Sequence, residues 1–198
     1  MQIQERKIAE CAEILAGFAL KARAEHEPDG AYQVIMPSHV PDGTPYRYAD
    51  AHKLRMTLPG SPEKYQVQSG DVLFISRGAR NCAAVIASVP DSTIASSTFY
   101  ILRANANVDP AYLAWCLNQQ PAQAQITQIR TGAGTPIVQR NKLGDVQIPV
   151  PDMQSQKRIA ELAALQAEEI GLRKKLLEAS ESHQRLLGQK IMAELGRK

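Results

Sequence analysis

Alternating apolar and polar residues predict several β-strands before residue 151. Val146, Ile148 and Val150 alternate with polar residues or proline, which is the two-residue period of a half-buried strand. Apolar runs at 32–36, 72–76, 83–87 and 99–103 indicate further strands, the second of which follows a turn at Gly70-Asp71. Proline at positions 149 and 151 ends the last strand, because proline cannot donate a hydrogen bond to a strand ladder.

Apolar residues at helical spacing predict short helices in the same region. A short helix or turn that ends near Gly17 is expected within 6–17, where four apolar residues recur with this spacing: Ile8, Cys11, Ala12 and Leu15. Asp109 and Pro110 are residue types preferred at the N-cap and first position of a helix, and a further helix is expected at 122–128. Strands and helices together predict a compact α/β domain at residues 1–151.

A single helical pattern follows this domain, at residues 152–198. Asp152 can accept hydrogen bonds from the free N–H groups of the first turn. No proline interrupts the stretch from Gln154 to Leu195, which as a helix spans about 60 Å. A domain of about 150 residues is only some 30–40 Å across, so the helix is too long to fold back entirely onto it.

The predicted helix has a wide apolar face. One heptad track contains Leu162, Leu165, Leu172, Leu176, Ala179 and Leu186, with interruptions at Glu169 and His183. A neighbouring track contains Ile159, Ala163, Ile170, Leu177, Leu187 and Ile191. Such a face is not expected to remain in water, and it predicts a coiled coil with a second copy or with another subunit.

Composition excludes several classes of protein. Of the 198 residues, 44% are hydrophobic and 22% charged, which is ordinary for a globular protein. Three widely spaced cysteines favour neither a metal site nor a disulfide framework and are typical of the cytosol. The chain opens without a signal peptide, and no run approaches the roughly 18 apolar residues of a membrane span, so we expect a cytoplasmic protein without a membrane partner.

Basic and amide side chains gather in loops. Lys and Arg outnumber Asp and Glu between Arg47 and Lys142, and 37–60 is an irregular insertion with aromatic and basic residues. Arg and Lys can neutralise phosphates or bind guanine, and Asn and Gln can pair with adenine. The candidate DNA contacts are Tyr46, Arg47, Tyr48, Arg77, Arg80, Asn81, Arg130, Gln139, Arg140, Asn141 and Lys142. Ordinary solvated surface is the alternative for each of them.

Motifs of catalysis are missing. Gly132-Ala133-Gly134-Thr135 lacks the Gly-Lys-Ser/Thr ending of a P-loop and the spacing of a dinucleotide fingerprint. The sequence also lacks the nucleophile elbow of hydrolases, the zinc motif of metalloproteases and the Asp/Asn-Pro-Pro-aromatic motif of amino-methyltransferases. We therefore expect a binding module with no catalytic residue, cofactor or metal.

Several motifs resemble those of specificity subunits of type I restriction-modification enzymes, and they follow one another along the chain in the order found in that family. The run Ile148-Pro149-Val150-Pro151, followed by Gln156 to Ala160, resembles the segment that closes a target-recognition domain in that family. Ser155 stands where the family usually has Glu, and Asp152 where it often has a second proline. Three other stretches are similar to family patterns: Ile8–Cys11 with Gly17, Gly70–Gly78, and Pro110–Leu113.

The resemblance implies a target-recognition domain at 1–151 and a helix for dimerisation and subunit docking at 152–198. Full-length members carry two such units in tandem, so this chain is similar to a half-subunit. The implied function is sequence-specific binding of double-stranded DNA, which positions methyltransferase subunits for adenine N6 methylation and a restriction/translocase subunit for cleavage. The implied assembly is a homodimer or a pair with a second half-subunit.

Two alternatives from other classes stay open. One is a coiled-coil assembly or adaptor protein whose globular domain binds protein, and the other is an enzyme with an unrecognised site. The DNA sequence recognised does not follow from the residues, because loop conformation decides which side chain reaches which base edge.

Overall fold

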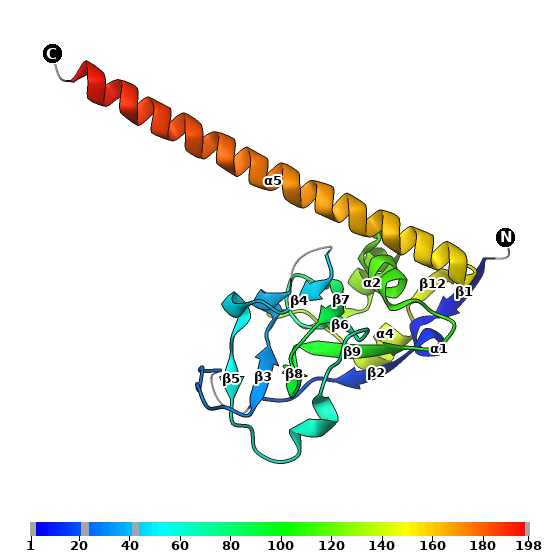
Figure 1. Cartoon of the computed structure of the whole chain (residues 1–198). Coiled ribbons are helices and arrows are strands. Elements are labelled where there is room, and N and C mark those ends of the chain that lie inside the picture. Colours follow the sequence, from blue (N-terminus) through cyan, green and yellow to red (C-terminus); the bar gives the residue numbers. More distant parts are fainter. Residues whose placement is uncertain (1–2, 21–23, 41–43, 197–198) are drawn as a thin grey trace. The chain divides into compact units, whose positions relative to one another are not determined.

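A five-stranded sheet lies at the centre of residues 1–161 (Figure 1). The computed structural model describes residues 3–20, 24–40 and 44–196, apart from the side chain of Asp50. The strand order is β2 (Ala12–Ala16), β9 (Phe99–Ala104), β6 (Val72–Ile75), β7 (Ala83–Ser88) and β4 (Tyr46–Arg47). Neighbouring strands are antiparallel, except that β4 runs parallel to β7.

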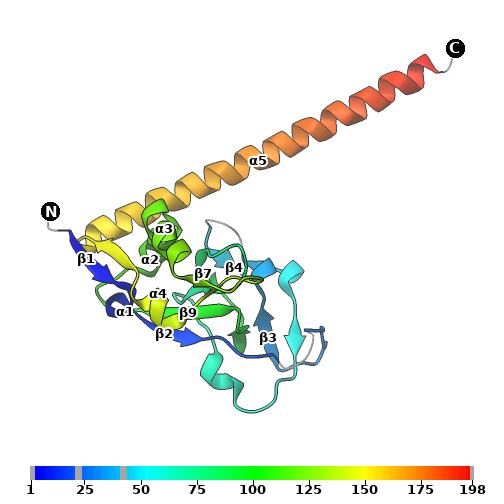
Figure 2. The ribbon, with the colours of Figure 1, turned by 180° about the vertical axis from the view of Figure 1, so that it is seen from behind.

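Strand β6 is buried on both faces, because a separate hydrophobic core covers each face. Val72 and Phe74 join the core formed with helices α2 (Pro110–Asn118), α3 (Gln120–Gln128) and α4 (Arg140–Gly144). Leu73 and Ile75 point to the opposite side, where they join the second core. Figure 2 shows helices α2, α3 and α4 beside this sheet.

A three-stranded sheet forms a smaller lobe, in the order β5 (Arg55–Met56), β3 (Tyr32–Ile35) and β8 (Thr93–Ala95). Its own core contains Phe18, Val34, Met56 and Ile94. Three short 3-10 helices connect it to the larger sheet: η1 (Pro37–His39), η2 (Asp50–His52) and η3 (Pro62–Tyr65). The described part of the irregular insertion predicted at 37–60 consists of such turns and two-residue strands.

The predicted strands are confirmed to within one residue at each end. The last of them is β12 (Gln147–Val150), which pairs antiparallel with β1 (Gln4–Lys7). Strand β1 is not among the strands that the sequence predicts. An exposed ion pair of 2.9 Å between Lys7 Nζ and Asp145 Oδ1 lies beside this pairing. The two strands bring the start of the chain against the segment that precedes the long helix.

The short helix or turn expected to end near Gly17 is confirmed only in its first part. Only α1 (Ile8–Cys11) is helical, and the following residues form β2, with Ala12 opposite Ala104 and Ala16 opposite Tyr100 on β9. Pairing with a long neighbouring strand overrides the local helical spacing, which is a weak preference. Directly after the strand, position 17 requires glycine, because a Cβ atom there would lie 2.1 Å from the carbonyl oxygen of Ser96.

The other helices are confirmed. Helix α2 begins after Asp109, whose Oδ1 accepts a hydrogen bond from Tyr112 N at 2.9 Å, and Pro110 occupies its first turn. Helix α3 starts two residues earlier than predicted, at Gln120. The predicted α/β fold followed by a long helix is therefore confirmed.

Helix α5 runs from Met153 to Leu195, and Asp152 Oδ1 accepts a hydrogen bond from Ser155 N at 2.9 Å at its start. The chain divides into compact units at 161/162, inside this helix and ten residues beyond the predicted boundary at 151. The first turns belong to the larger unit because Ile159 and Ala160 pack against its core.

The rest of α5 exposes its apolar face. Five leucines of the predicted track are 60–69% exposed: Leu162, Leu165, Leu172, Leu176 and Leu186. Within the described residues, no helix is long and apolar enough to cross a membrane.

Gln156 is the one fully buried residue among the described positions of α5, at 1% exposure. Its Oε1 accepts a hydrogen bond from Asp109 N at 2.8 Å. Its Nε2 donates to the carbonyl oxygens of Asn107 at 3.0 Å and Pro151 at 2.9 Å. One amide side chain thus links the first turn of α5, the end of β12 and the start of α2.

Gln156→Leu is expected to lower the free energy of unfolding by about 1–3 kcal/mol, because it leaves a buried N–H and two carbonyl groups without their partner. Urea unfolding followed by the fluorescence of Trp115, the only tryptophan, measures this. Gln154→Leu, at an exposed position of the same turn, is the control and should change little. Equal stability of both variants would contradict a stabilising role of the hydrogen bonds of Gln156.

Candidate nucleic-acid interface

Three short extended segments lie side by side at the end of β6. β10 (Arg130–Thr131) pairs antiparallel with β11 (Ile137–Val138), and β11 pairs on its other side with the residues that follow β6. In that second pairing, Gly78 N donates to Pro136 O and Val138 N donates to Ser76 O, both at 2.9 Å. Residues 76–78 and 130–138 are called the ribbon.

The tip of the ribbon is exposed and carries small side chains. Residues 131–135 are all exposed. Gly132 has φ +100°, a conformation that favours glycine, and a Cβ atom there would lie 3.0 Å from Thr135 O. The glycines therefore give a tight turn at which a ligand can approach the backbone closely.

The arginines of this region differ in what their side chains do. Arg130 Nη2 donates to Gly78 O at 3.3 Å inside the ribbon. Arg80 Nη2 donates to Pro37 O at 2.8 Å and Val40 O at 3.2 Å, and so ties the turn after the ribbon to η1. Arg77 is exposed and makes no side-chain hydrogen bond or ion pair with the described part of the chain. Its guanidinium is therefore available to a ligand.

Two predicted DNA contacts are buried. Tyr46 is 0% exposed, its ring stacks on His52 with centroids 5.6 Å apart, and burial raises its pKa to about 12. Asn81 is 6% exposed, and its Nδ2 donates to Ile75 O at 2.9 Å. Their burial argues against DNA contact: Tyr46 packs in the second core, and Asn81 closes the turn after β6.

The remaining predicted contacts lie at two places. Arg47 is exposed and Tyr48 half-buried at β4, the edge strand of the large sheet. Gln139, Arg140, Asn141 and Lys142 are exposed at the start of α4, which follows the ribbon directly in the chain. Leu143 anchors this short helix in the core. DNA contact by the exposed residues stays a prediction.

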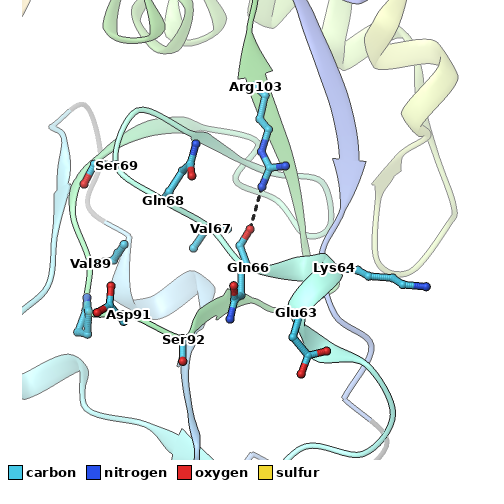
Figure 3. Close-up of a pocket in the computed structure, with 11 residues that line it drawn as sticks. Glu63, Lys64, Gln66, Val67, Gln68, Ser69, Val89, Asp91, Ser92 and Arg103 are labelled. Carbon is cyan, nitrogen blue, oxygen red and sulfur yellow. Dashed lines mark hydrogen bonds between the residues drawn. The ribbon is translucent and has the colours of Figure 1, made fainter.

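A polar pocket of about 540 Å³ lies elsewhere, between residues 63–69 and 89–92 (Figure 3). Arg103 on its wall donates from Nη2 to Gln66 O at 2.9 Å and pairs through Nε with Asp71 at 3.2 Å. Burial raises the pKa of the Asp71 carboxyl, and its hydrogen bond from Gln68 N and the Arg103 guanidinium act in the opposite direction. Arg103 thus orders the loop before β6.

The ribbon is the part of the candidate interface that sequence reasoning missed. The available signal was a Gly-containing turn between two pairs of strand-forming residues, Arg130–Thr131 and Ile137–Val138, which is typical of a hairpin. Within the described residues, no cluster of three or more His, Cys, Asp or Glu could hold a metal ion.

Comparison with known proteins identifies the family. A family model described as the type I restriction modification DNA specificity domain matches residues 2–179. The chain belongs to this family. No curated protein sequence matches it.

Solved structures of the same family share the fold. The S subunit of a type I restriction-modification system from M. genitalium superimposes with a TM-score of 0.60 at 15% identity, over 90% of this chain and 42% of that one. HsdS from Thermoanaerobacter tengcongensis gives 0.59 at 15% identity, over 87% and 39%. A chain from a study of complex assembly and conformational transition of the type I system gives 0.67 at 16% identity, over 93% and 43%.

The present chain thus spans about two fifths of the length of these solved chains. Membership in the family supports a role in DNA sequence specificity. It also supports the expectation that the chain is not itself an enzyme, because specificity subunits are the non-catalytic members of type I systems.

Two neighbouring arginines should differ in their effect on stability. Arg80→Ala is expected to lower the free energy of unfolding by about 0.5–1.5 kcal/mol, because its hydrogen bonds to η1 are lost. Arg77→Ala should leave stability unchanged within about 0.5 kcal/mol, as at an ordinary surface position. Urea unfolding of both variants tests this contrast. A loss of stability in Arg77→Ala equal to that in Arg80→Ala would show that Arg77 is a structural residue.

Proposed function

We propose that the chain is the DNA-reading unit of a type I restriction-modification complex, which binds double-stranded DNA sequence-specifically. In this proposal, separate methyltransferase subunits carry out adenine N6 methylation, and a translocating nuclease subunit cleaves. The observation that carries it is the available guanidinium of the exposed Arg77 on the ribbon, within a domain of the DNA specificity family.

The distribution of exposed cations supports duplex binding. Arg77 on the ribbon and Arg140 and Lys142 on the following α4 are exposed. Cations at such positions neutralise phosphates and release counterions, which drives binding of any duplex sequence. Amide side chains beside them, Gln139 and Asn141, can pair with base edges or phosphates.

The apolar face of α5 supports pairing of two such units. Leu176 is 69% exposed and Leu172 60%, and water contact over such a face is unfavourable. We propose that a second copy of the helix covers it, in a coiled coil that runs antiparallel so that the recognition domains lie at opposite ends. A second unit of the same kind, on another chain, is the alternative occupant.

Symmetry then constrains the DNA target. A twofold axis relates two identical recognition domains, which therefore bind identical half-sites in opposite orientation. In this proposal the target is an interrupted palindrome, and the helix rather than the recognition loops determines the length of its spacer.

Duplex binding should weaken steeply with salt, and the cations of α4 should contribute to this dependence. Arg140→Ala with Lys142→Ala is expected to weaken binding to all duplex sequences similarly and to reduce the slope of log affinity against log salt by about 1–2. Fluorescence anisotropy with labelled duplexes measures it, with Lys157→Ala and Arg158→Ala on α5 as the matched control. Wild-type protein that fails to bind duplex would contradict the proposed function and favour the adaptor alternative.

Charge in the apolar face should separate the units. Leu172→Lys with Leu176→Lys is expected to yield monomers with weaker DNA binding, because association would bury unpaired like charges. Ser182→Lys with Gln189→Lys adds the same charge outside both apolar tracks, about 80–140° around an ideal helix from Leu172 and Leu176, and should leave the dimer intact. Light scattering gives the mass of each variant. A wild-type monomer at micromolar concentration, with DNA binding that needs no second unit, would contradict this arrangement.

A further inference from the structure

The ribbon has an inner and an outer face, which the pairing of its segments assigns. Residues directly opposite each other in an antiparallel pair point to the same face. Arg130 lies opposite Val138, which is 0% exposed, so this pair is on the inner face toward the core. Thr131 lies opposite Ile137, and Ile137 lies opposite Arg77. These three residues therefore form a row on the other face, which is called the outer row.

Exposure agrees with this assignment. Arg77 and Thr131 are exposed, and Ile137 between them is half-buried. The hydrogen bonds between 76–78 and 136–138 flank the pair formed by Arg77 and Ile137 rather than joining it. In antiparallel sheets this is the closer kind of pair, with Cα atoms about 4.5 Å apart, which brings the two side chains together.

The outer row is held in place from behind. Tyr100 Oη donates to Val138 O at 2.9 Å and anchors β11 to the central sheet through β9. Arg130 Nη2 donates a hydrogen bond to Gly78 O, which links β10 to residues 76–78, the two segments on either side of β11. A recognition surface on such a support loses little conformational freedom on binding.

The chemistry of the outer row fits base edges better than phosphates. A phosphate-binding surface needs cations or N–H donors, and the half-buried Ile137 in the centre of the row provides neither. A guanidinium can bind guanine O6 and N7 with two hydrogen bonds, a threonine hydroxyl can bond several bases, and an apolar side chain can contact the thymine methyl group. Three segments at the sheet spacing of about 4.8 Å are about 10 Å from first to last, which compares with a major groove about 12 Å wide.

We propose that the ribbon enters the major groove and that Arg77, Ile137 and Thr131 contact adjacent base pairs, so that this row determines part of the sequence recognised. The inference rests on the proposed function, because it assumes that the chain binds duplex DNA. Thr131 and Ile137 are new candidate contacts, and Arg77 becomes a base contact rather than only a source of charge.

The decisive variant is Arg77→Lys, which keeps the charge but removes the planar fork. Full-length wild-type and variant chains are each used to select from a random-sequence duplex library, and bound sequences are counted. Arg77→Lys should reduce the preference for guanine at one position of each half-site by roughly 5- to 150-fold, the range of a bidentate contact, with an unchanged salt slope. Thr131→Val removes the hydroxyl and should alter the preference at a neighbouring position.

Controls separate the outcomes. Arg158→Lys, at an exposed position of α5, makes the same change outside the ribbon and should select the wild-type sequences, and circular dichroism checks the fold of each variant. Wild-type preferences retained by both Arg77→Lys and Thr131→Val would overturn the inference. A change that affects only discrimination of A·T from G·C pairs would also overturn it, in favour of the minor groove. Failure of the wild type to select any duplex would instead contradict the proposed function itself.

Discussion

Val72 and Phe74 on one side of β6, with Leu73 and Ile75 on the other, place this strand in two cores at once. A strand of four buried apolar residues cannot shift its register by one position without exchanging the two sets. The residues that follow it, 76–78, are therefore fixed in position and hold β11 through two backbone hydrogen bonds. The location of the ribbon, and of Arg77 on it, thus depends on the packing of β6.

Much of this fold follows from local pattern. Alternation and apolar runs predict β3, β6, β7, β9 and β12. Successive side chains of a strand lie on opposite faces, so the order of apolar and polar residues indicates which face is buried. The same reasoning fails at β2, since Ile8, Cys11, Ala12 and Leu15 fit a helix as well as a strand. Only the neighbouring β9 decides between them, and the pairing of Glu13 with Arg103 spans ninety residues of sequence. Long-range pairing is not encoded in local periodicity.

The candidate site was less predictable, because residue type does not reveal burial. Tyr46 and Asn81 have side chains suited to binding DNA, yet both are buried, one in a stack with His52 and one in the turn after β6. Thr131 and Ile137 have no distinctive chemistry and become candidates only because the ribbon aligns them with Arg77. Helix α5 shows the opposite case: its start at Met153 is predicted within one residue and its end at Leu195 within three, but the sequence pattern does not identify the partner of its apolar face.

The arginines show why net charge alone says little about the function of this protein. Arg103 binds Asp71 and Gln66 O, Arg80 binds carbonyl groups of η1, and Arg130 contacts Gly78 O. Each of these side chains donates hydrogen bonds to its own chain and orients a loop. Their field still attracts a polyanion, but Arg77 has all its donors available within the described structure. Recognition of a base edge needs such available donors, and the hydrogen bonds of Arg130 and Arg80 hold the backbone on either side of Arg77.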